Sequence, residues 1–411
     1  MNVLWITNVE LPAVAREKNH NIVICGWLEV MAAQLTKMPD INLYVASSTD
    51  YSTYLDEVID GTHYYAFNEP NSDGILDRAL ADAKPDVIHM WGTEMWHCKV
   101  FTNLVQQAGY LDRFVVSIQG LTHIYDKHFI VDIPSKVVNG RTLKEHYRRP
   151  NIADFHQIMH EHGLEEIEIL KMIKYCIGRT RWDYDAVKAV NPSVTYFTGE
   201  ESLREQFYRG EWTYEACNEH TIFYSQAHYP VKGFHIFLKA LARLKQSYED
   251  VKVKVLGADP FSKKGLNALI DASSYESYIK KLIIRYNLRD NIEFLGKLDA
   301  DAMLRQYKLA NVFVCASTIE NSSNSVCEAM LVGTPVVASR VGGMESIIDH
   351  GISGLIYDLE DTEAMVGHIE KLFEDESLCR ELSNNAKEVA MKRHDKENNF
   401  SRLLEIYNTI M

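Results

Sequence analysis

Two glutamates, Glu320 and Glu328, stand in a stretch that is rich in serine and asparagine. Seven residues separate them, and the five at positions 321–325 are all Asn or Ser. Carboxylate, hydroxyl and amide groups are the side chains that hold a ligand through its own hydroxyls. Each glutamate also has a plain structural interpretation. Glu320 could be a solvated loop acid, and Glu328 could close a capping box with Ser325 at the start of a helix.

The sequence around these glutamates predicts one strand–loop–helix–strand unit. The apolar run Val312–Ala316 predicts a buried strand, and Ser325–Val332 predicts a short helix. Gly333 ends that helix, and a second strand follows Pro335. Ligands of open parallel sheets bind beyond the carboxyl ends of the strands, which is where this loop lies.

A longer ordered pattern surrounds the two glutamates, and it resembles a known family. The pattern consists of Glu320, seven residues, Glu328-Ala329-Met330, the run Gly333-Thr334-Pro335-Val336-Val337-Ala338-Ser339, Val341-Gly342-Gly343-Met344-Glu345, and the pair Gly351 and Gly354. It is similar to the donor site of the retaining glycosyltransferases of family 4, which have the GT-B fold. The resemblance covers most of the chain and is strongest from about residue 220 to 375.

The resemblance implies roles for the residues that match the pattern. The backbone N–H groups of Asn324, Ser325 and Val326 would bind the diphosphate of a nucleotide-diphosphate sugar. Glu328 would accept hydrogen bonds from the two ribose hydroxyls, and Glu320 would orient the transferred sugar. No metal and no cofactor is expected besides the donor substrate.

A second loop predicted to bind the donor spans residues 226–233 and precedes an amphipathic helix. Lys232 and Gly233 match the family, in which the lysine adds a positive charge to an anion site at the helix N-terminus. The family's Gly-Arg pair is replaced by Gln226 and Ala227. We hypothesise that His228, once protonated, partly replaces the missing arginine.

In the first half of the chain the family pattern is weaker. Gly26 keeps one member of a Gly-Gly pair whose backbone approaches the donor diphosphate, and Cys25 replaces the other. Gln119 stands where the family has a histidine beside the donor sugar. An amide can bind a sugar hydroxyl but cannot change charge, so Gln119 is excluded as an acid or base. His123 and Tyr125 are the candidates for the acceptor side, with a plain loop histidine as the alternative for His123.

Residues 121–150 interrupt the alternation of strands and helices with mixed polarity and a basic run. We expect an acceptor-side or membrane-proximal loop here, with a solvated insertion as the alternative. His156 and His160 share one face of the helix that follows, but no third ligand is evident, so no metal site is predicted.

Apolar runs alternate with helical patterns in both halves, which predicts an α/β fold with two Rossmann-like, doubly wound parallel sheets. The GT-B resemblance implies that these domains face a central cleft. The boundaries are expected at 1–200 for the acceptor-side domain, 201–392 for the donor domain and 393–411 for a C-terminal helix that crosses back to the first domain.

Composition excludes several classes of protein. The chain has 411 residues, 46% of them apolar and 24% charged, and its net charge of −14 argues against a nucleic-acid binder. No signal peptide or apolar run of membrane-spanning length is visible. Seven scattered cysteines predict thiols in a reducing compartment. A cytoplasmic protein is expected, with peripheral contact at the inner face of the membrane through residues 121–150 as a further expectation.

The function predicted from the sequence is transfer of a sugar from a UDP- or GDP-sugar to a glycan, lipid-linked or small-molecule acceptor with retention, in cell-surface polysaccharide or glycoconjugate synthesis. No carboxylate pair suggests a glycosidase-like double displacement. Two alternatives stay open. One is a sugar-nucleotide epimerase or a phosphorylase of the same architecture, and the other is a non-catalytic subunit that binds a nucleotide sugar.

Overall fold

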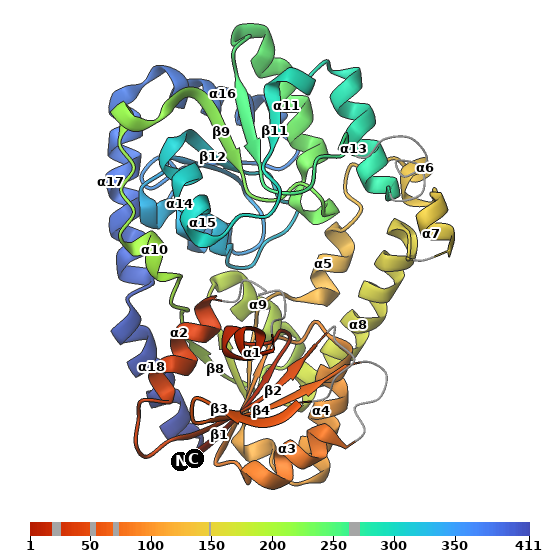
Figure 1. The fold of residues 1–411 in the computed structure, drawn as a ribbon, viewed down its shortest axis with the longest axis vertical. Coiled ribbons are helices and arrows are strands. Elements are labelled where there is room, and N and C mark those ends of the chain that lie inside the picture. The colour runs from red at the N-terminus through yellow and green to blue at the C-terminus, as the bar shows by residue number, and fades with distance from the viewer. Residues whose placement is uncertain (19–25, 50–54, 69–73, 148, 263–271) are drawn as a thin grey trace. The chain divides into compact units, whose positions relative to one another are not determined.

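The computed structural model describes residues 1–18, 26–49, 55–68, 74–147, 149–262 and 272–411. The chain divides into two compact units. The first unit comprises Met1–His123, His162–Arg204 and His394–Met411, and the second comprises Ile124–Glu161 and Glu205–Arg393. Each unit is built on one sheet (Figure 1).

The first unit contains an eight-stranded sheet. Its strands lie in the order β3 (Leu55–Ile59), β4 (Thr62–Phe67), β2 (Asn42–Ser48), β1 (Asn2–Thr7), β5 (Val87–Trp91), β6 (Phe114–Ser117), β7 (Tyr175–Gly178) and β8 (Thr195–Thr198). All neighbouring pairs are parallel except β3 and β4. The two-residue turn between β3 and β4 is Asp60-Gly61, and both residues have positive φ, as a tight hairpin turn requires.

Helices cover both faces of this sheet. They are α1 (Pro12–Glu17), α2 (Gly26–Leu35), α3 (Ile75–Ala83), α4 (Trp96–Gln107), α9 (Arg181–Val190) and α18 (Lys396–Ile410), and the turn η1 (Leu111–Arg113) precedes β6. Alternate residues of a strand face opposite sides, so Val3 and Trp5 of β1 point to one core cluster. That cluster includes Leu28 of α2 and Ile406 of α18. The C-terminal helix is therefore an integral part of the first unit.

The second unit contains a six-stranded sheet that is parallel throughout. Its strands lie in the order β11 (Ile292–Phe294), β10 (Lys252–Val255), β9 (Asn218–Tyr224), β12 (Ala310–Cys315), β13 (Val336–Ser339) and β14 (Leu355–Tyr357). Every residue of β12 and β13 is buried. Continuous apolar runs of this kind are typical of parallel strands that are covered on both faces.

The helices and short turns of the second unit follow from the same alternation. The helices are α6 (Ser135–Val138), α7 (Leu143–Tyr147), α10 (Glu205–Tyr208), α11 (Phe234–Ser247), α13 (Ser274–Arg285), α14 (Ala300–Leu309), α15 (Asn324–Val332), α16 (Thr362–Glu374) and α17 (Glu376–Arg393). The 3-10 turns are η2 (Tyr214–Ala216), η3 (Pro230–Lys232), η4 (Arg289–Asn291) and η5 (Met344–Ser346). Two further helices, α5 (Thr122–His128) and α8 (Ile152–Met172), contribute residues to both units.

Residues 124–161 belong to the second unit, which differs from the predicted domain boundaries. Contacts with α11 and α13 are the physical reason. Val131 O accepts a hydrogen bond from His235 Nε2 at 2.9 Å, and Glu145 Oε1 accepts one from the Ser274 N–H at 2.7 Å. The change at 204/205 lies four residues after the boundary expected between residues 200 and 201.

Candidate functional site

Glu320 and Lys232, both predicted for the donor site, form an ion pair in the second unit. Lys232 Nζ lies 2.6 Å from Glu320 Oε1, and Ser317 Oγ donates to the same oxygen at 2.8 Å. Glu320 Oε2 has no hydrogen-bond donor among the residues that the structure describes. Glu320 as a whole is 6% exposed, so the loop encloses most of it. Its Oε2 is the carboxylate oxygen that remains for a ligand.

Glycines hold the backbone on both sides of this ion pair. Gly342 has φ +53°, and a Cβ there would lie 1.9 Å from Glu320 O. The next N–H, of Gly343, donates to the same carbonyl oxygen at 2.9 Å. Gly233 has φ +68°, and a Cβ there would lie 1.8 Å from Ala316 O. The glycines of the sequence pattern are therefore required by close backbone approach as well as by left-handed conformation.

The charge on Lys232 is maintained by its neighbour. Burial alone would lower the pKa of Lys232, but the negative charge of Glu320 and the hydrogen bond to it outweigh burial, so the pKa is raised. Lys232 closes η3, and Gly233 is the N-cap of α11. The lysine thus lies beside a helix N-terminus at the carboxyl end of β9, where an anion is favoured.

Tyr125 lies in the second unit, beside the residues predicted for the donor site, and not in the first unit with His123. The Asn321 N–H donates to Tyr125 Oη at 2.9 Å. Thr318 Oγ1 donates to His128 O at 2.9 Å, which ties the same loop to α5. The segment predicted as an acceptor-side loop therefore supports the loop that carries Glu320.

The capping-box interpretation of Glu328 is wrong. Helix α15 begins at Asn324, its N-cap is Ser323, and no side chain caps it. Ser325 thus lies within the helix, where it cannot be the N-cap. Glu328 is 5% exposed, and its Oε2 lies 3.3 Å from the hydroxyl of Tyr307. The first N–H groups of α15, at Asn324, Ser325 and Val326, lie at the start of a helix, where no preceding turn supplies their acceptors.

His228 is exposed and lies in the loop that leads to Lys232. Partial burial and the positive charge of Lys232 lower the pKa of His228. Its Nδ1 lies 3.5 Å from the place that a Cβ on Gly257 would occupy, so the ring lies against the loop that follows β10. Ala227, at the position of the family's arginine, is 5% exposed. Gly26 begins α2, and the loop before it, with Cys25, is outside the described residues.

In the first unit, the Gln119 amide is part of a buried polar network that the sequence did not reveal. Gln119 Nε2 donates to Glu201 Oε1 at 2.6 Å, and Arg179 Nη2 donates to Gln119 Oε1 at 3.3 Å. Arg179 Nη1 pairs with Glu201 Oε2 at 2.7 Å, with both side chains 5% exposed. Both ends of the amide are thus in use. The available signal was position, since Arg179 directly follows the strand β7 and Glu201 stands at the expected domain boundary.

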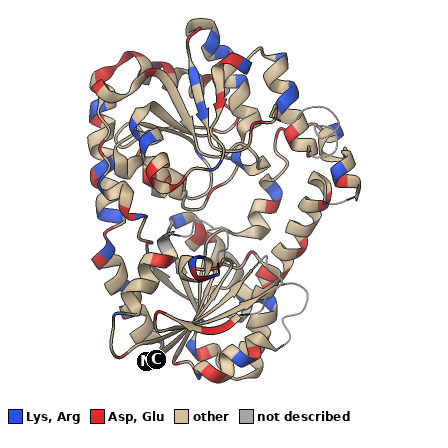
Figure 2. Cartoon of the chain, in the orientation of Figure 1, with Lys and Arg blue, Asp and Glu red and all other residues tan. Residues whose placement is uncertain are grey.

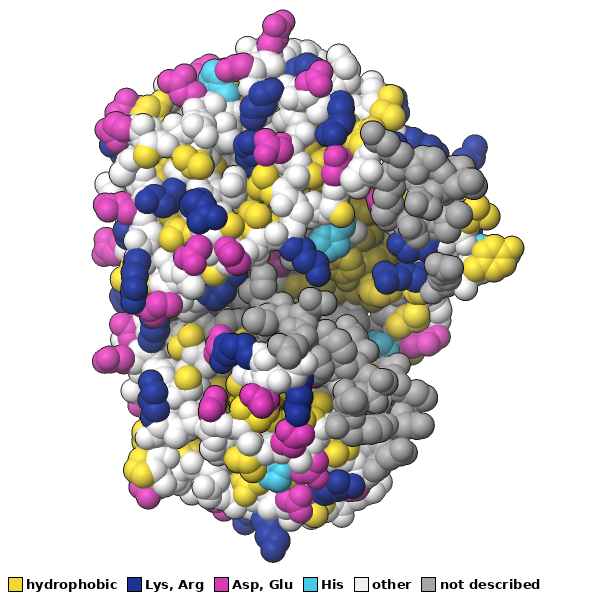
Figure 3. Space-filling view, viewed as in Figure 1, with side chains coloured by type: hydrophobic (Ala, Val, Ile, Leu, Met, Phe, Trp, Pro, Cys, Tyr) yellow, Lys and Arg dark blue, Asp and Glu magenta, His cyan; other side chains and the backbone are white. Residues whose placement is uncertain are grey.

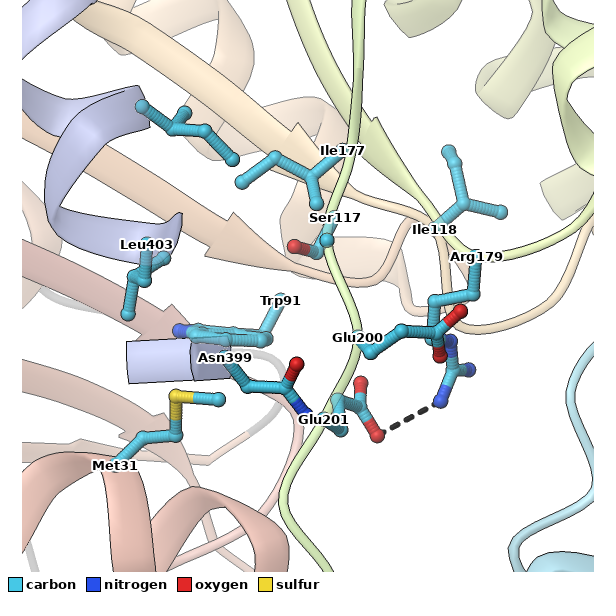
Figure 4. Close-up of a pocket in the computed structure, with 12 residues that line it drawn as sticks. Met31, Trp91, Ser117, Ile118, Ile177, Arg179, Glu200, Glu201, Asn399 and Leu403 are labelled. Carbon is cyan, nitrogen blue, oxygen red and sulfur yellow. Dashed lines mark hydrogen bonds and ion pairs between the residues drawn. The ribbon is translucent and has the colours of Figure 1, made fainter. Parts of the chain in front are cut away.

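Arg179 and Glu201 line a small pocket in the first unit (Figure 4). Its volume for the centres of water molecules is about 20 Å³, which is enough for roughly one or two waters. Trp91, Ser117 and Leu403 form part of its wall and are labelled in Figure 4. The pocket is too small to hold a sugar, so we interpret the buried Arg179–Glu201 pair in its wall as part of the packing of the first unit.

His123, predicted for the acceptor side, has its ring held by a buried carboxylate. His123 Nδ1 lies 2.6 Å from Glu166 Oε2, and Glu166 is fully buried. Sequence reasoning missed Glu166. The glycine three residues earlier on the same helix, Gly163, is the only local sign that α8 lies against another backbone here.

No metal site and no membrane-spanning helix is found within the described ranges. His156 and His160 both pair with Asp126, at 2.7 and 2.8 Å. The six described cysteines are free thiols, and all but Cys217 are buried. Acidic and basic side chains are interspersed on the helices of both units and across the surface drawn in Figure 3 (Figures 2 and 3).

Comparison with known proteins gives the following relationships. Residues 215–389 match the family model described as glycosyl transferases group 1. The chain is 28% identical over 180 residues to D-inositol 3-phosphate glycosyltransferase of Corynebacterium urealyticum, covering 44% of this chain and 41% of that protein. The match to this relative thus spans less than half of its length.

Similarity to solved structures extends over the whole chain. Sucrose-phosphate synthase from Thermosynechococcus elongatus superposes with a TM-score of 0.71 at 15% identity, covering 100% of this chain and 99% of that one. Anabaena Alr3699/HepE in complex with UDP-glucose gives a TM-score of 0.69 at 15% identity, with 99% of each chain covered. Residues 215–389 therefore carry the sequence pattern of the group 1 glycosyl transferases, and the chain has the GT-B fold.

Proposed function

We propose that this protein is a retaining glycosyltransferase of family 4 type. It transfers a sugar from a UDP- or GDP-sugar to a carbohydrate or lipid-linked acceptor, without a metal, in glycoconjugate or polysaccharide synthesis. The observation that carries the proposal is the Lys232–Glu320 pair, in which a cation and a carboxylate with one open oxygen lie at the carboxyl ends of β9 and β12. That arrangement is suited to a ligand with both phosphates and hydroxyls.

The leaving diphosphate gains negative charge in the transition state, so its binding groups must be placed in advance. Lys232 and the N-terminus of α15 supply a full positive charge and a set of N–H donors. Glu320 Oε2 accepts a hydrogen bond from a hydroxyl of the transferred sugar, and the carboxylate favours the positive charge that develops at the anomeric carbon. Glu328 binds the ribose hydroxyls.

The proposed route to retention is attack from the face that the diphosphate leaves. The acceptor oxygen bonds to the anomeric carbon as the carbon–oxygen bond to the diphosphate breaks. The electron pair of that bond goes to the diphosphate oxygen, which takes the proton of the acceptor. This route needs no protein nucleophile. Gln119, whose amide is engaged at both ends by Glu201 and Arg179, is given no step in this route.

The proposal predicts that a UDP- or GDP-sugar stabilises the protein. A ligand at a hundredfold excess over its dissociation constant adds about 2.7 kcal/mol, which raises the melting temperature of domains of this size by several degrees. The measurement is a thermal shift with a panel of nucleotide sugars, with and without EDTA. Loss of the shift in EDTA would remove the metal-independent part of the proposal, and no shift with any donor would remove the donor site.

Two alternatives are separated by turnover. An epimerase releases a changed nucleotide sugar without any acceptor, and a phosphorylase transfers a sugar to or from inorganic phosphate. A non-catalytic subunit binds a donor and never consumes it across a broad acceptor panel. Release of nucleotide diphosphate that depends on a hydroxylated acceptor supports the transferase, and proton NMR of the product reads the anomeric configuration.

A further inference from the structure

A second polar group lies at the carboxyl edge of the first sheet and takes no part in the donor site. Thr93 and Glu94 follow β5, and His123 follows β6 at the start of α5. Glu166 reaches them from α8. Parallel sheets bind ligands at this edge, so each of these side chains occupies a place where a substrate group could be held.

Glu166 is fully buried and is surrounded by donors. Its Oε2 lies 2.6 Å from His123 Nδ1 and accepts the His123 N–H at 3.0 Å. Its Oε1 accepts from the hydroxyl of Thr93. A buried carboxylate is retained only when it is hydrogen bonded in this way. The contacts hold the backbone and the ring of His123 at the same time.

The helix α8 is built to allow this contact. Gly163 lies one turn before Glu166 on the same face, and a Cβ there would lie 2.8 Å from His123 Cα and 3.0 Å from its N. A glycine inside a helix costs about 1 kcal/mol relative to alanine. The close approach of His123 to α8 explains why a glycine stands here.

The bond to Glu166 determines what His123 presents. Because Nδ1 faces the carboxylate, Nε2 is the ring nitrogen left to contact a hydroxyl of a ligand. Nε2 has no hydrogen-bond partner among the described residues. The side chain of His123 is 12% exposed, so the ring is enclosed apart from a small accessible part.

Glu94 is the second group at this edge. Its two oxygens accept from the Gly120 N–H and from Asn8 Nδ2, both at 2.9 Å. A Cβ on Gly92 would lie 2.2 Å from Glu94 Oε2, so only glycine lets the carboxyl fold back to these donors. Burial, together with the negative charge of Glu166, raises the pKa of Glu94 to about 7.

We infer that His123 and Glu94 form a subsite for an uncharged, hydroxylated acceptor such as a sugar or polyol. His123 Nε2 forms a hydrogen bond with one acceptor hydroxyl, and Glu94 binds a second. This inference rests on the proposed function, since the bound sugar or polyol is an acceptor only if the protein is a transferase. Binding of a polyol at His123 can be tested without that assumption.

The charges at this edge select against a phosphorylated acceptor. Glu94 and Glu166 are both acidic, and no lysine or arginine is bonded to either within the part of the chain that the structure describes. A phosphate group brought to His123 would meet the carboxyl groups of Glu166 and Glu94, neither of which has a bonded lysine or arginine among the described residues, and like charges at close range are unfavourable. The subsite therefore favours a neutral sugar over its phosphate ester.

Nitrogen-15 NMR of the histidine side chains tests binding directly. The protein is labelled with ¹⁵N-histidine, and the His123 signals are assigned as those missing in His123→Gln. We expect D-glucose or D-mannose at high millimolar concentration, with UDP present, to shift the His123 Nε2 signal. Glucose 6-phosphate is expected to shift it at least about tenfold more weakly at equal concentration. A stronger response to glucose 6-phosphate, or no response to any neutral sugar or polyol, would overturn the inference.

Variants provide the second arm of the test. His123→Gln retains an amide donor for Glu166 but loses the Nε2 group, and Glu94→Gln replaces an ionisable carboxyl with a neutral amide. With a donor found in the thermal-shift panel, His123→Gln is expected to raise the acceptor KM about tenfold and to leave the donor Kd unchanged. Glu94→Gln is expected to reduce the difference in acceptor KM between glucose and glucose 6-phosphate. An unchanged acceptor KM in His123→Gln, together with an unchanged difference in KM between the two sugars in Glu94→Gln, would refute the subsite. A failure of every donor to bind would refute the proposed function alone.

Discussion

Glu328 is a stronger candidate for ligand binding because it does not close a capping box with Ser325. It lies inside α15, past the first turn, and its carboxylate meets the hydroxyl of Tyr307. We predict that Glu328→Gln lowers nucleotide affinity at least about tenfold, since a hydrogen bond to a charged group contributes about 1.5–3 kcal/mol. The melting temperature without ligand should change little, because the amide oxygen still accepts from Tyr307. Calorimetric titration with UDP and GDP measures this affinity. Wild-type affinity in the variant would show that Glu328 has a structural role and does not bind the nucleotide.

His228 gives the donor site a pH dependence. In the free protein its pKa is lowered by burial and by Lys232, whereas a bound phosphate would raise it. Affinity gained from protonation is fully present below the free-state pKa and is lost as pH rises through the pKa of the complex. The donor Kd should therefore fall between about pH 8 and 6 in the wild type, and this slope should flatten in His228→Ala. Lys232→Ala should weaken binding at every pH. A wild-type slope in His228→Ala would exclude the histidine.

At the level of single residues, the sequence located some groups by type and missed others by context. Lys232 and Glu320 were identified from their pattern, and the structure brings them together. Arg179, Glu201, Glu94 and Glu166 were missed because a buried charged residue and a solvated one look the same in sequence. Only the partner distinguishes a buried charged residue from a solvated one. In the pair Arg179–Glu201 the partner lies 22 positions away in the sequence. Tyr125 was assigned to the acceptor side because nothing local shows that its helix contributes to the second unit.

Helix α8 offers a matched test of packing against propensity. Gly163→Ala should gain about 1 kcal/mol of helix propensity and lose more, because the new methyl would meet the backbone of His123 at 2.8 Å. Gly367 lies inside α16 with nothing within 4 Å of its Cβ position, so Gly367→Ala should stabilise the protein by up to about 1 kcal/mol. Urea unfolding measures both variants. Equal stabilisation by the two substitutions would mean that α8 shifts freely away from α5.

Elements were predictable where apolar periodicity is strong. All six strands of the second sheet coincide with runs that are rich in apolar residues. Of these, β12, β13 and β14 are buried along their whole length, so their sequences are almost uniformly apolar. The hairpin β3–β4 was missed on its first strand, whose central residues Asp56 and Glu57 are exposed. Asp60-Gly61 was the available signal for that turn.

At the level of the whole molecule, α18 is joined to the first sheet by a buried polar chain. Trp5 Nε1 donates to Tyr407 Oη at 2.9 Å, and Tyr407 Oη lies 2.7 Å from His89 Nδ1. The fully buried His89 is neutral, with its pKa lowered by burial to about 3, so the tyrosine donates to it. His89 Nε2 in turn lies 2.7 Å from Ser117 Oγ. A single hydroxyl thus satisfies two buried groups.

Tyr407→Phe should leave both groups without a partner and destabilise the protein by about 2–4 kcal/mol, since each unsatisfied buried group costs about 1–3 kcal/mol. Tyr147→Phe is the control, because Tyr147 is 76% exposed and its loss should change stability by less than about 0.5 kcal/mol. Hydrogen exchange at β1 and β5 would locate the effect. Unchanged protection of both strands in Tyr407→Phe would show that the helix contributes packing alone.

The composition of the first unit from three separate stretches of chain sets the order of events during synthesis. Domains commonly fold as they leave the ribosome, the N-terminal one first. Here Trp5 of β1 has no partner for its indole N–H until Tyr407 is made, which is translated 402 residues later. The second unit, whose last stretch ends at Arg393, is complete before the first one can close. Until residues 394–411 have been made, the first unit lacks the side chains of α18 that fill its core, even though residues 1–123 are translated before any part of the second unit.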